Sequence, residues 1–456
     1  MKIAVIGGGY VGLVSAACFA SMGADVTVAE VDPAKLAALR AGMIPIYEPG
    51  LDLLVAEGAR AGRLRFEDSL EVVLRDVSVV FLAVGTPSRR GDGHADLSYV
   101  YAAATQIARA LTGPVVVVTK STVPVGTGRR LQQMMLDLRP DLRIDVASNP
   151  EFLREGSAIG DFMQPDRVVI GTDSGHARAV LATLYAPLDL IGTPIVFTGL
   201  ETAELIKYAA NAFLAMKITF INEMADLCEA LGADVDDLAR GLGHDERIGA
   251  RFLHPGPGFG GSCFPKDTQA LMRIAQDAGA PSRLVEAVVG VNEARKASMA
   301  GRVIAAFGGS VRGRRIAVLG LTFKPETDDM RDAPSIGIVH RLIEEGASIV
   351  AFDPAGHEQA KPQLPAAVGY AADVGGAVAG ADGVVLVTEW NAFRDLSPEW
   401  LRDTLSGRVV VDLRNVFSPE AMRDAGLSYS SIGRAPAPPK EEPLAPRDAE
   451  RLSIAA

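Results

Sequence analysis

The stretch Lys2-Ile-Ala-Val-Ile-Gly-Gly-Gly-Tyr-Val-Gly12 decides the fold. It begins with a short, mainly apolar run that ends in glycines, which is typical of a buried parallel strand. Residues 11–22 are small and apolar and predict a helix that Gly23 ends, and residues 26–29 predict the next strand. The order strand, helix, strand indicates a βαβ unit.

The same pattern continues along the first half of the chain. Short apolar runs, separated by stretches of helical composition, predict buried strands at residues 79–84, 115–119, 144–147 and 168–170. Strands that alternate with helices favour an α/β fold with a parallel, doubly wound sheet.

The second half of the chain contains an internal repeat. Four segments repeat earlier ones in the same order: 315–320 repeats 2–7, 346–354 repeats 23–33, 384–388 repeats 81–86, and 409–415 repeats 115–122. We therefore expect a second Rossmann-like domain.

Residues 201–231 differ from both halves, because polar and apolar residues recur there at helical spacing with no Gly or Pro. A helix of this length spans about 45 Å, which suits a connector between domains, and its apolar face predicts a homodimer. The expected domains are a Rossmann domain at 1–199, a central helical domain at 200–300, a Rossmann-like domain at 301–434 and a proline-rich, disordered tail at 435–456.

The opening glycines match G-x-G-x-x-G between a strand and a helix, the context of a dinucleotide site. Gly7 permits a tight turn, Gly9 lets the backbone approach a pyrophosphate at the helix N-terminus, and Gly12 allows close helix–strand packing. Glu30 ends the second strand and is placed to bind the ribose hydroxyls, with Asp32 as a close rival. An acid there favours NAD over NADP. The repeated half lacks these glycines, so we expect one NAD per chain.

The stretch Gly258-Phe-Gly-Gly-Ser-Cys-Phe-Pro-Lys-Asp267 has the composition of a reactive cysteine loop. Its glycines let the backbone fold closely around a ligand. Lys266 is expected to favour the thiolate of Cys263, and Asp267 lies one helical turn after the cysteine. A nucleophile and a base serving one centre explain this combination of residues.

Composition excludes several classes of function. The chain has 456 residues, with 45 Lys+Arg and 56 Asp+Glu, so its net charge is −11 and we expect no nucleic-acid or membrane-surface partner. Three cysteines are too few for a disulfide framework, and Cys18 and Cys228 lie in apolar helical stretches. The six histidines lack metal-ligand spacing, so we expect no metal. Without a targeting segment or a membrane-length apolar run, we expect a soluble cytoplasmic protein.

With these motifs, the chain resembles the UDP-glucose 6-dehydrogenases of the UDP-glucose/GDP-mannose dehydrogenase superfamily over residues 1–433. The likeness lies in GGGYVG (7–12), VGTP (84–87), KSTVPVGT (120–127), SNPEFLREG (148–156), KYAANAFLAMK (207–217), ERIGARFLHPGPGFGGSCFPKDT (246–268), LGLTFKPETDDMRDAPS (319–335) and DLRN (412–415). The resemblance implies that a primary alcohol is oxidised twice, to a carboxylate, with two NAD per turnover.

The resemblance also implies roles for six catalytic residues. These are the nucleophile Cys263, the pair Lys207 and Asp267 that handles the first proton and stabilises developing oxyanions, and Thr122, Glu151 and Asn211 around the catalytic water and substrate hydroxyls. As a neutral base Lys207 would need a strongly lowered pKa. As a cation that stabilises the alkoxide it needs no shift, and we expect this role.

Further residues are similar to ligand contacts of the family. The implied NAD contacts are Val11, Glu30, Lys35, Thr86, Thr122, Glu155, Lys266 and Arg331, in addition to the glycines. The implied nucleotide-sugar contacts are Glu151, Phe152, Leu153, Arg154, Glu155, Lys207, Asn211, Arg247, Phe252, Leu253, His254, Pro255, Gly256, Gly260, Lys324 and Arg414. One departure is Glu30, which stands where aspartate is more usual.

The chemistry explains why such a dehydrogenase needs a cysteine. The first oxidation gives an aldehyde, which Cys263 traps as a thiohemiacetal, and the second leaves a thioester that water hydrolyses. We expect UDP-glucose as substrate, with GDP-mannose or an N-acetylated UDP-hexosamine as alternatives. Two other interpretations stay open here: a two-electron dehydrogenase with a structural cysteine, which would yield one NADH per sugar, and an inactive NAD-binding protein.

Overall fold

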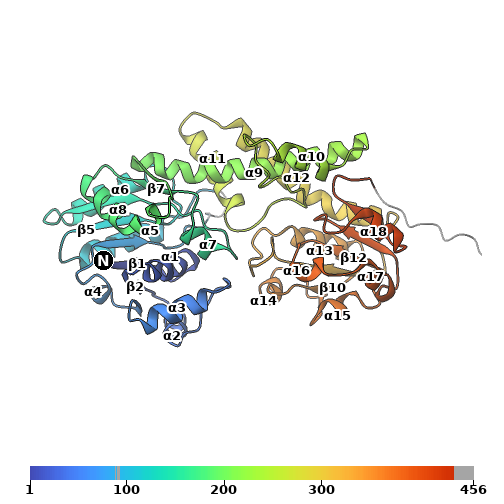
Figure 1. Cartoon of the computed structure of the whole chain (residues 1–456), viewed down its shortest axis with the longest axis horizontal. Coiled ribbons are helices and arrows are strands. Elements are labelled where there is room, and N and C mark those ends of the chain that lie inside the picture. The colour runs from blue at the N-terminus through green and yellow to red at the C-terminus, as the bar shows by residue number, and fades with distance from the viewer. Residues whose placement is uncertain (88, 90–92, 436–456) are drawn as a thin grey trace, which may run out of the picture. The chain divides into compact units, whose positions relative to one another are not determined.

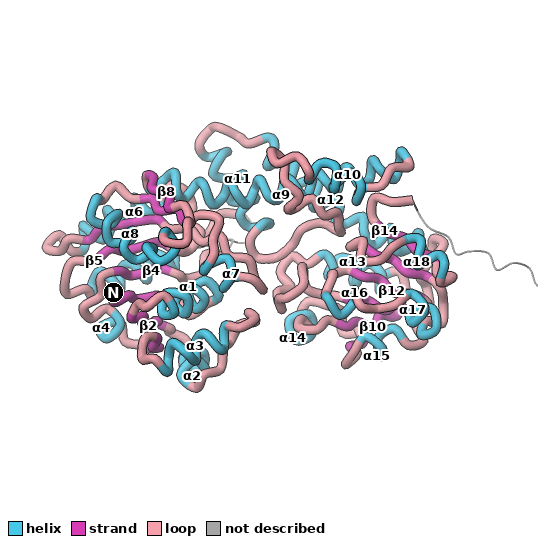
Figure 2. The backbone as a smooth tube through the Cα atoms, viewed as in Figure 1, coloured by secondary structure: helices cyan, strands magenta, loops and turns pink. Residues whose placement is uncertain are grey.

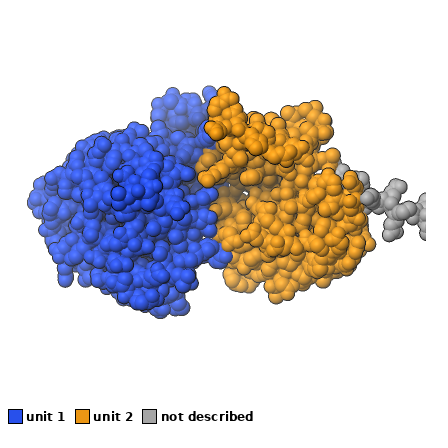
Figure 3. Space-filling view, in the orientation of Figure 1, with its two compact units in different colours: residues 1–213, 263–287 blue, residues 214–262, 288–456 orange. Residues whose placement is uncertain are grey.

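The computed structural model describes residues 1–87, 89 and 93–435. The chain forms two compact units (Figure 3): residues 1–213 with 263–287, and residues 214–262 with the segment from 288 onward. Apart from Ala435, the tail expected at 435–456 lies outside the described residues. Among the described residues, no helix has the length and apolar character that crossing a membrane requires.

The first unit is built on an eight-stranded sheet with the order β3-β2-β1-β4-β5-β6-β7-β8. Its strands are β1 Lys2–Ile6, β2 Asp25–Ala29, β3 Leu64–Glu67, β4 Val79–Leu82, β5 Val115–Thr119, β6 Ile144–Ser148, β7 Val168–Gly171 and β8 Ile195–Thr198. The strands from β3 to β6 pair in parallel, but β6 pairs with β7 in antiparallel fashion. The predicted doubly wound α/β sheet is confirmed. Its antiparallel pairing of β6 with β7 was not predicted, because a strand's composition does not encode its direction.

Helices cover both faces of this sheet, as a parallel sheet buried on both sides requires (Figure 1). They are α1 Tyr10–Ser21, α2 Pro33–Arg40, α3 Leu51–Arg60, α4 Leu70–Val73, α5 Ser98–Ala110, α6 Thr127–Leu138, α7 Ala158–Met163 and α8 Gly175–Asp189. On one face, Phe19 of α1 stacks on Phe81 of β4 at 5.0 Å between ring centroids. This packing fixes α1, and with it the glycine loop that begins the helix.

One unbroken helix, α9 (Leu200–Leu231), runs from the first unit into the second, as the sequence predicts. Its 32 residues correspond to about 48 Å. The other helices of this middle region are α10 Val235–Gly243, α11 Phe264–Asp277 and α12 Arg283–Ala306.

The second unit contains its own sheet, whose strands are magenta in Figure 2. This six-stranded sheet has the order β11-β10-β9-β12-β13-β14, and every pairing in it is parallel. This order repeats that of the first six strands of unit 1, so the predicted second Rossmann-like fold is confirmed. The strands are β9 Arg315–Leu319, β10 Ser348–Phe352, β11 Gly369–Tyr370, β12 Gly383–Leu386, β13 Val409–Asp412 and β14 Ser428–Ser431. The helices are α13 Pro334–Glu344, α14 His357–Ala360, α15 Val374–Val378, α16 Asn391–Arg394, α17 Pro398–Thr404 and α18 Pro419–Asp424.

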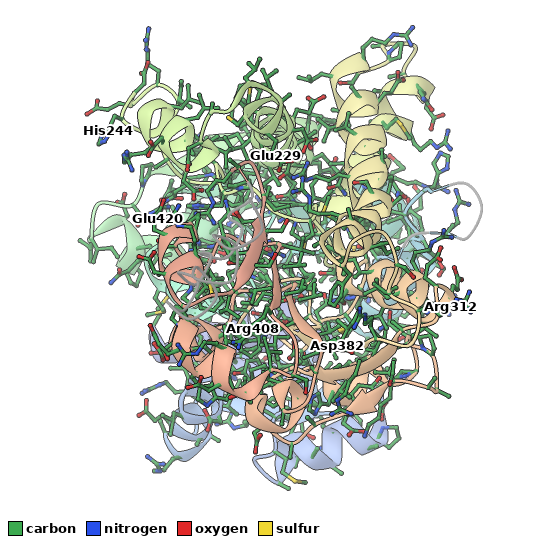
Figure 4. All side chains as sticks on the ribbon, turned by 90° about the vertical axis from the view of Figure 1, so that its right-hand side faces the viewer. Glu229, His244, Arg312, Asp382, Arg408 and Glu420 are labelled. Carbon is green, nitrogen blue, oxygen red and sulfur yellow. The ribbon has the colours of Figure 1, made fainter. Side chains whose placement is uncertain are left out.

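A charged contact fastens the end of the described chain to α9. Glu229, labelled in Figure 4, accepts two hydrogen bonds from Arg302 at 2.7 and 2.8 Å. The same carboxylate accepts the backbone N–H of Gly433 at 2.6 Å. Helices α9 and α12 and the segment after β14 are thereby joined in unit 2.

Candidate active site

The glycine loop has the geometry of a dinucleotide site. A Cβ on Gly12 would lie 1.9 Å from the Gly7 carbonyl oxygen, and Gly7 itself has φ +109°, so the protein's own backbone requires both glycines. A Cβ on Gly9, in contrast, would meet no atom within 4 Å. Gly9 is the N-cap residue of α1, and among the described residues no side chain caps this helix. Its first N–H groups therefore suit an anion such as a pyrophosphate, and NAD fits the loop.

Glu30 is anchored beside this loop. Its Oε2 accepts the Gly8 N–H at 3.2 Å and its Oε1 accepts the Asp32 N–H at 2.9 Å. The rival Asp32 caps α2, because its carboxylate accepts the N–H groups of Ala34 and Lys35. Since capping already uses Asp32, the geometry favours Glu30 as the ribose ligand.

The other expected NAD contacts are spread over both units. Ser121 hydrogen-bonds the carbonyls of Leu82 and Val84, which holds together the loops after the neighbouring strands β4 and β5. Thr86 and Thr122 lie in these two loops and are half-buried. Four of the remaining expected contacts lie in unit 1: Val11, Glu155 and Lys266 are half-buried, and Lys35 is exposed. The fifth, Arg331, lies exposed in unit 2, where it pairs with Asp329.

Cys263 occupies the N-cap position of α11, where the helix dipole stabilises negative charge. Asp267 lies one turn later, fully buried, and its N–H donates to the Cys263 carbonyl at 2.8 Å. Both Asp267 oxygens are bound: Asn211 donates to one at 2.6 Å, and Lys266 donates to the other. The expected grouping of a nucleophile with a carboxylate on one helical turn is thus present in unit 1.

A second buried pair lies in the same unit. Lys207 donates to Glu151 at 3.0 Å, and Glu151 also accepts the Leu153 N–H at 2.6 Å. Burial alone would raise the pKa of Glu151, but the pKa lies below its ordinary value because Lys207, this N–H and Lys120 outweigh the cost of burial. Glu151 is therefore ionised at neutral pH.

The pKa of Lys207 indicates which role its geometry permits. Burial alone would lower this pKa, yet Glu151, Cys263 and Asp267 together raise it above its ordinary value. Lys207 is thus a cation near the cysteine and both carboxylates, which supports alkoxide stabilisation over general-base catalysis. Its hydrogen-bond partner is Glu151, while Asp267 raises its pKa through charge.

Sequence reasoning missed a buried network behind this cluster. Lys120, at the end of β5, donates to the Asn149 side-chain oxygen at 3.0 Å. Tyr185 donates to the same oxygen, and the Asn149 amide donates to the Val169 carbonyl at 2.8 Å. Burial lowers the pKa of Lys120 to about 8. The only signal in the sequence was a charged residue directly after an apolar strand.

The other two cysteines have the environment of structural residues. Cys18 and Cys228 are both buried. Burial raises the pKa of the Cys18 thiol to about 12 and also raises that of Cys228. Within the described part of the chain, no group of three His, Cys, Asp or Glu side chains is placed to hold a metal ion.

The expected nucleotide-sugar residues divide between the units. Phe152, Leu153, Arg154 and Glu155 belong to unit 1. The Arg167 guanidinium lies over the Phe152 ring, 3.7 Å from its centroid. Leu153 and Glu155 are half-buried, and Arg154 is exposed and pairs with Asp161. The stretch 252–256 belongs to unit 2: Leu253, Pro255 and Gly256 are buried, His254 is exposed, and Phe252 has φ +67°, a strained value for a non-glycine residue.

Gly260 and Gly261 have a structural reason to be glycine. A Cβ on Gly260 would lie 2.3 Å from the Asp332 carbonyl oxygen, and one on Gly261 would lie 2.7 Å from the Phe323 ring. These two glycines thus let the loop before Cys263 pack closely on residues 320–333, and the contact of Gly260 with a ligand stays a prediction.

The expected basic contacts of unit 2 have different surroundings. Arg247 is 89% exposed and pairs with Asp245. Arg414 is half-buried and donates to the carbonyls of Val387 and Phe323 at 2.8 and 3.0 Å. Lys324 is half-buried, next to Phe323. Arg414 thus braces the loop that carries Lys324.

The chain matches three domain profiles of one protein family. Residues 1–189 match the profile of the UDP-glucose/GDP-mannose dehydrogenase family, NAD binding domain. Residues 201–294 match the central domain of the same family, and residues 317–419 match its UDP binding domain.

Individual relatives resemble the chain over most of its length. It is 57% identical to a UDP-glucose 6-dehydrogenase of Rhizobium meliloti (strain 1021), over 95% of this chain and 100% of the relative. It is 47% identical to the UDP-glucose 6-dehydrogenase TuaD of Bacillus subtilis (strain 168), over 95% of this chain and 93% of the relative. The solved structure of a UDP-glucose dehydrogenase from Pyrobaculum islandicum is similar with a TM-score of 0.87 and 39% identity, over 95% and 98% of the two chains.

Proposed function

Because this chain belongs to the UDP-glucose/GDP-mannose dehydrogenase family, we propose that it oxidises the C6 primary alcohol of UDP-glucose to the carboxylate of UDP-glucuronate, with two NAD+ per sugar. The observation that carries the proposal is the cluster of Cys263, Lys207 with Glu151, and Asn211 with Asp267 in the unit that holds the glycine loop. These residues suit an oxidation that passes through a covalent intermediate.

NAD+, when bound at the glycine loop, accepts a hydride from C6 at each oxidation. In the first oxidation the hydroxyl proton passes to one of the two buried carboxylates, Glu151 or Asp267. The Lys207 ammonium stabilises the negative charge that develops on the alkoxide oxygen. The product of this step is an aldehyde that stays bound.

The Cys263 sulfur then forms a bond to C6, and the carbonyl electron pair moves to oxygen to give a thiohemiacetal. Loss of the second hydride leaves a thioester. Water, positioned by Thr122, Glu151 or Asp267, adds to the thioester carbonyl, and the C–S bond breaks to release the carboxylate and restore the thiolate. The sum is alcohol, water and two NAD+ giving carboxylate, two NADH and three protons.

We assign the binding of the nucleotide to residues of unit 2, which include the profile match to a UDP binding domain. The expected contacts there are Arg247, 252–256, Gly260, Lys324 and Arg414. The other expected nucleotide-sugar contacts, Glu151–Glu155, Lys207 and Asn211, belong to unit 1. We also propose a cytoplasmic location, since catalysis requires a reduced cysteine.

Helix α9 supports the proposal of a homodimer. Phe213, Phe220 and Leu227 are spaced by seven residues on this helix and are 59%, 44% and 47% exposed. A repeat of seven keeps these side chains on one face, where a second copy of the helix would cover them. Light scattering of the wild type and of Phe220→Lys tests this, and a wild-type monomer would contradict it.

The experiment that tests the proposed function is an NADH-production screen with purified protein. UDP-glucose, GDP-mannose and N-acetylated UDP-hexosamines are each supplied in limiting amount with excess NAD+. We expect UDP-glucose to be oxidised with two NADH per sugar. A response to GDP-mannose alone would overturn the substrate assignment, and one NADH per sugar would overturn the four-electron reaction.

A further inference from the structure

Helix α6 begins in an unusual way, because a carboxylate from another helix caps it. Its N-cap is Gly126, which has φ +91° and no side chain to offer the first turn. Glu204 of α9 fills this role: Oε2 accepts the Gly126 N–H at 2.6 Å and Oε1 accepts the Gly128 N–H at 2.7 Å. Glu204 is 2% exposed. A helix N-terminus favours such an anion through both its N–H groups and its dipole.

The contact fixes the rotation of α9. At about 100° per residue, Lys207 and Asn211 lie within about 60° of Glu204 around the helix axis. These two residues hold the catalytic carboxylates, since Lys207 donates to Glu151 and Asn211 donates to Asp267. A change in the rotation or height of α9 at Glu204 would therefore move both.

The contact also fixes the loop after β5. Thr122 lies in this loop, which ends at Gly126, and Thr127 hydrogen-bonds the Pro124 carbonyl at its close. Ser121 anchors its beginning. The Glu204 carboxylate holds the end of the same loop.

The two helices pack closely at this point. A Cβ on Gly128 would lie 3.1 Å from Glu204 Oε1 and 3.1 Å from a Leu200 methyl carbon. A side chain at 128 would thus push on α9 from the side of α6. The contact can be perturbed independently from each helix.

We propose that Glu204 is a positioning residue for the oxidation: its carboxylate caps α6 and thereby places Thr122, Lys207 and Asn211 relative to one another. The inference rests on the proposed function for its activity measurements. The structural evidence for it is the two hydrogen bonds that Glu204 accepts and the face of α9 that Glu204 shares with Lys207 and Asn211.

Proton binding supplies a readout specific to this contact. Burial raises the pKa of Glu204 to about 7, and Glu201 adds to this while the two backbone N–H groups and Arg129 oppose it. The other titratable group facing it is the buried Tyr208 hydroxyl. As pH falls through about 7, the cap loses its charge, so we expect kcat of the wild type to fall there.

The test compares Glu204→Gln with Glu201→Gln. Glutamine keeps one acceptor oxygen but turns an amide towards the second N–H. Glu201 lies one turn earlier on α9 and is 44% exposed, in a surface ion pair with Arg129, so it is a matched control. We expect Glu204→Gln to lower kcat about 10- to 100-fold, to raise KM for NAD+, and to lose the fall in kcat near pH 7. KM for UDP-glucose changes less. Glu201→Gln keeps the wild-type kcat above the Glu204 pKa and still shows the fall in kcat, at a slightly lower pH because Glu201 contributes to raising that pKa.

Two measurements separate positioning from simple loss of folded protein. Thermal unfolding and titration of the Cys263 thiol give the folded fraction, and kcat is expressed per folded site. Gly128→Ala, which strains the same contact from α6, is expected to lower kcat in the same direction. An unchanged kcat and pH profile in Glu204→Gln, or a loss explained by the unfolded fraction, would overturn the inference. If the wild type itself makes no NADH from UDP-glucose, the proposed function fails instead.

Discussion

The two sheets share a strand order, but the loops at equivalent strand ends differ. In unit 1, β1 is followed by the tight glycine turn and α1 begins at Tyr10. In unit 2, β9 is followed by residues 320–333 before α13 begins at Pro334. The short turn exposes a helix N-terminus to a pyrophosphate, whereas the long loop packs against Gly260 and Gly261. One scaffold therefore supports two kinds of site, and the loops decide which.

The ends of the second strands show the same contrast. Glu30 follows β2 and accepts two backbone N–H groups. Asp353 follows β10, is 2% exposed, and accepts the N–H groups of Leu321 and Thr322 on one oxygen and those of Ala355 and Gly356 on the other. Asp353 serves the fold, which explains why an acid at this position does not by itself predict a ribose site.

The largest effect that separates the two acids is expected on stability. Asp353→Asn removes the charge from a carboxylate with four backbone N–H donors and should lower the free energy of unfolding by about 2–4 kcal/mol. Both tryptophans, Trp390 and Trp400, lie in unit 2, so urea unfolding followed by fluorescence reports on this unit. Glu30→Gln should leave this transition in place and raise KM for NAD+. A loss of stability in Glu30→Gln, together with a raised KM for NAD+ and unchanged stability in Asp353→Asn, would contradict these two roles.

A smaller effect is expected at Gly9. Since Gly9→Ala meets no protein atom, the fold should be unchanged, while the new methyl group weakens NAD+ binding about tenfold, or about 1.4 kcal/mol. Equilibrium titration with NAD+ measures this. Gly337→Ala in α13 of the other half also meets no atom within 4 Å and is the control. Equal NAD+ affinity in the two variants would contradict the assignment of the glycine loop.

A third effect concerns the ends of the fifth strands, where unit 1 buries the lysine Lys120 and unit 2 buries the carboxyl group of Asp412. The pKa of Lys120 is about 8 when folded and lies below its unfolded value, so the folded chain binds fewer protons between these values. The free energy of unfolding of the wild type should therefore rise between about pH 8 and about pH 10. We expect this rise to exceed that of Lys120→Met by about 1–2 kcal/mol.

Thermal unfolding followed by circular dichroism across this pH range measures the difference. Lys2→Met removes an exposed lysine of the same unit but keeps Lys120. Its stability should therefore rise with pH as that of the wild type does. If Lys120→Met follows the wild type at every pH, Lys120 is not a buried cation with a lowered pKa.

Much of the fold could be predicted from local patterns. The apolar runs at β1, β5 and β9 and the unbroken helical spacing of α9 carry their own signals, and the repeat revealed the second sheet. Strand β8 gave no clear signal because it is half exposed, and β3 gave none because two of its four residues are charged. The reversal at β7 depends on how the chain crosses the sheet, which no local pattern records.

The sequence indicates candidate site residues one by one, but not which of them pair. Cys263 and Asp267 share a helical turn, so spacing alone joins them. Lys207 and Glu151 are 56 residues apart, and only the fold shows that they pair. Glu204 was visible as a position on the helix, but its partners on α6 were not.

The most direct test of the account is intact mass spectrometry of Cys263→Ser incubated with UDP-glucose and NAD+. Serine can still attack the aldehyde, but its ester hydrolyses more slowly than a thioester. We expect a UDP-glucuronyl adduct on residue 263, while Cys263→Ala shows neither adduct nor carboxylate product. Formation of UDP-glucuronate by Cys263→Ala at the wild-type rate would contradict it.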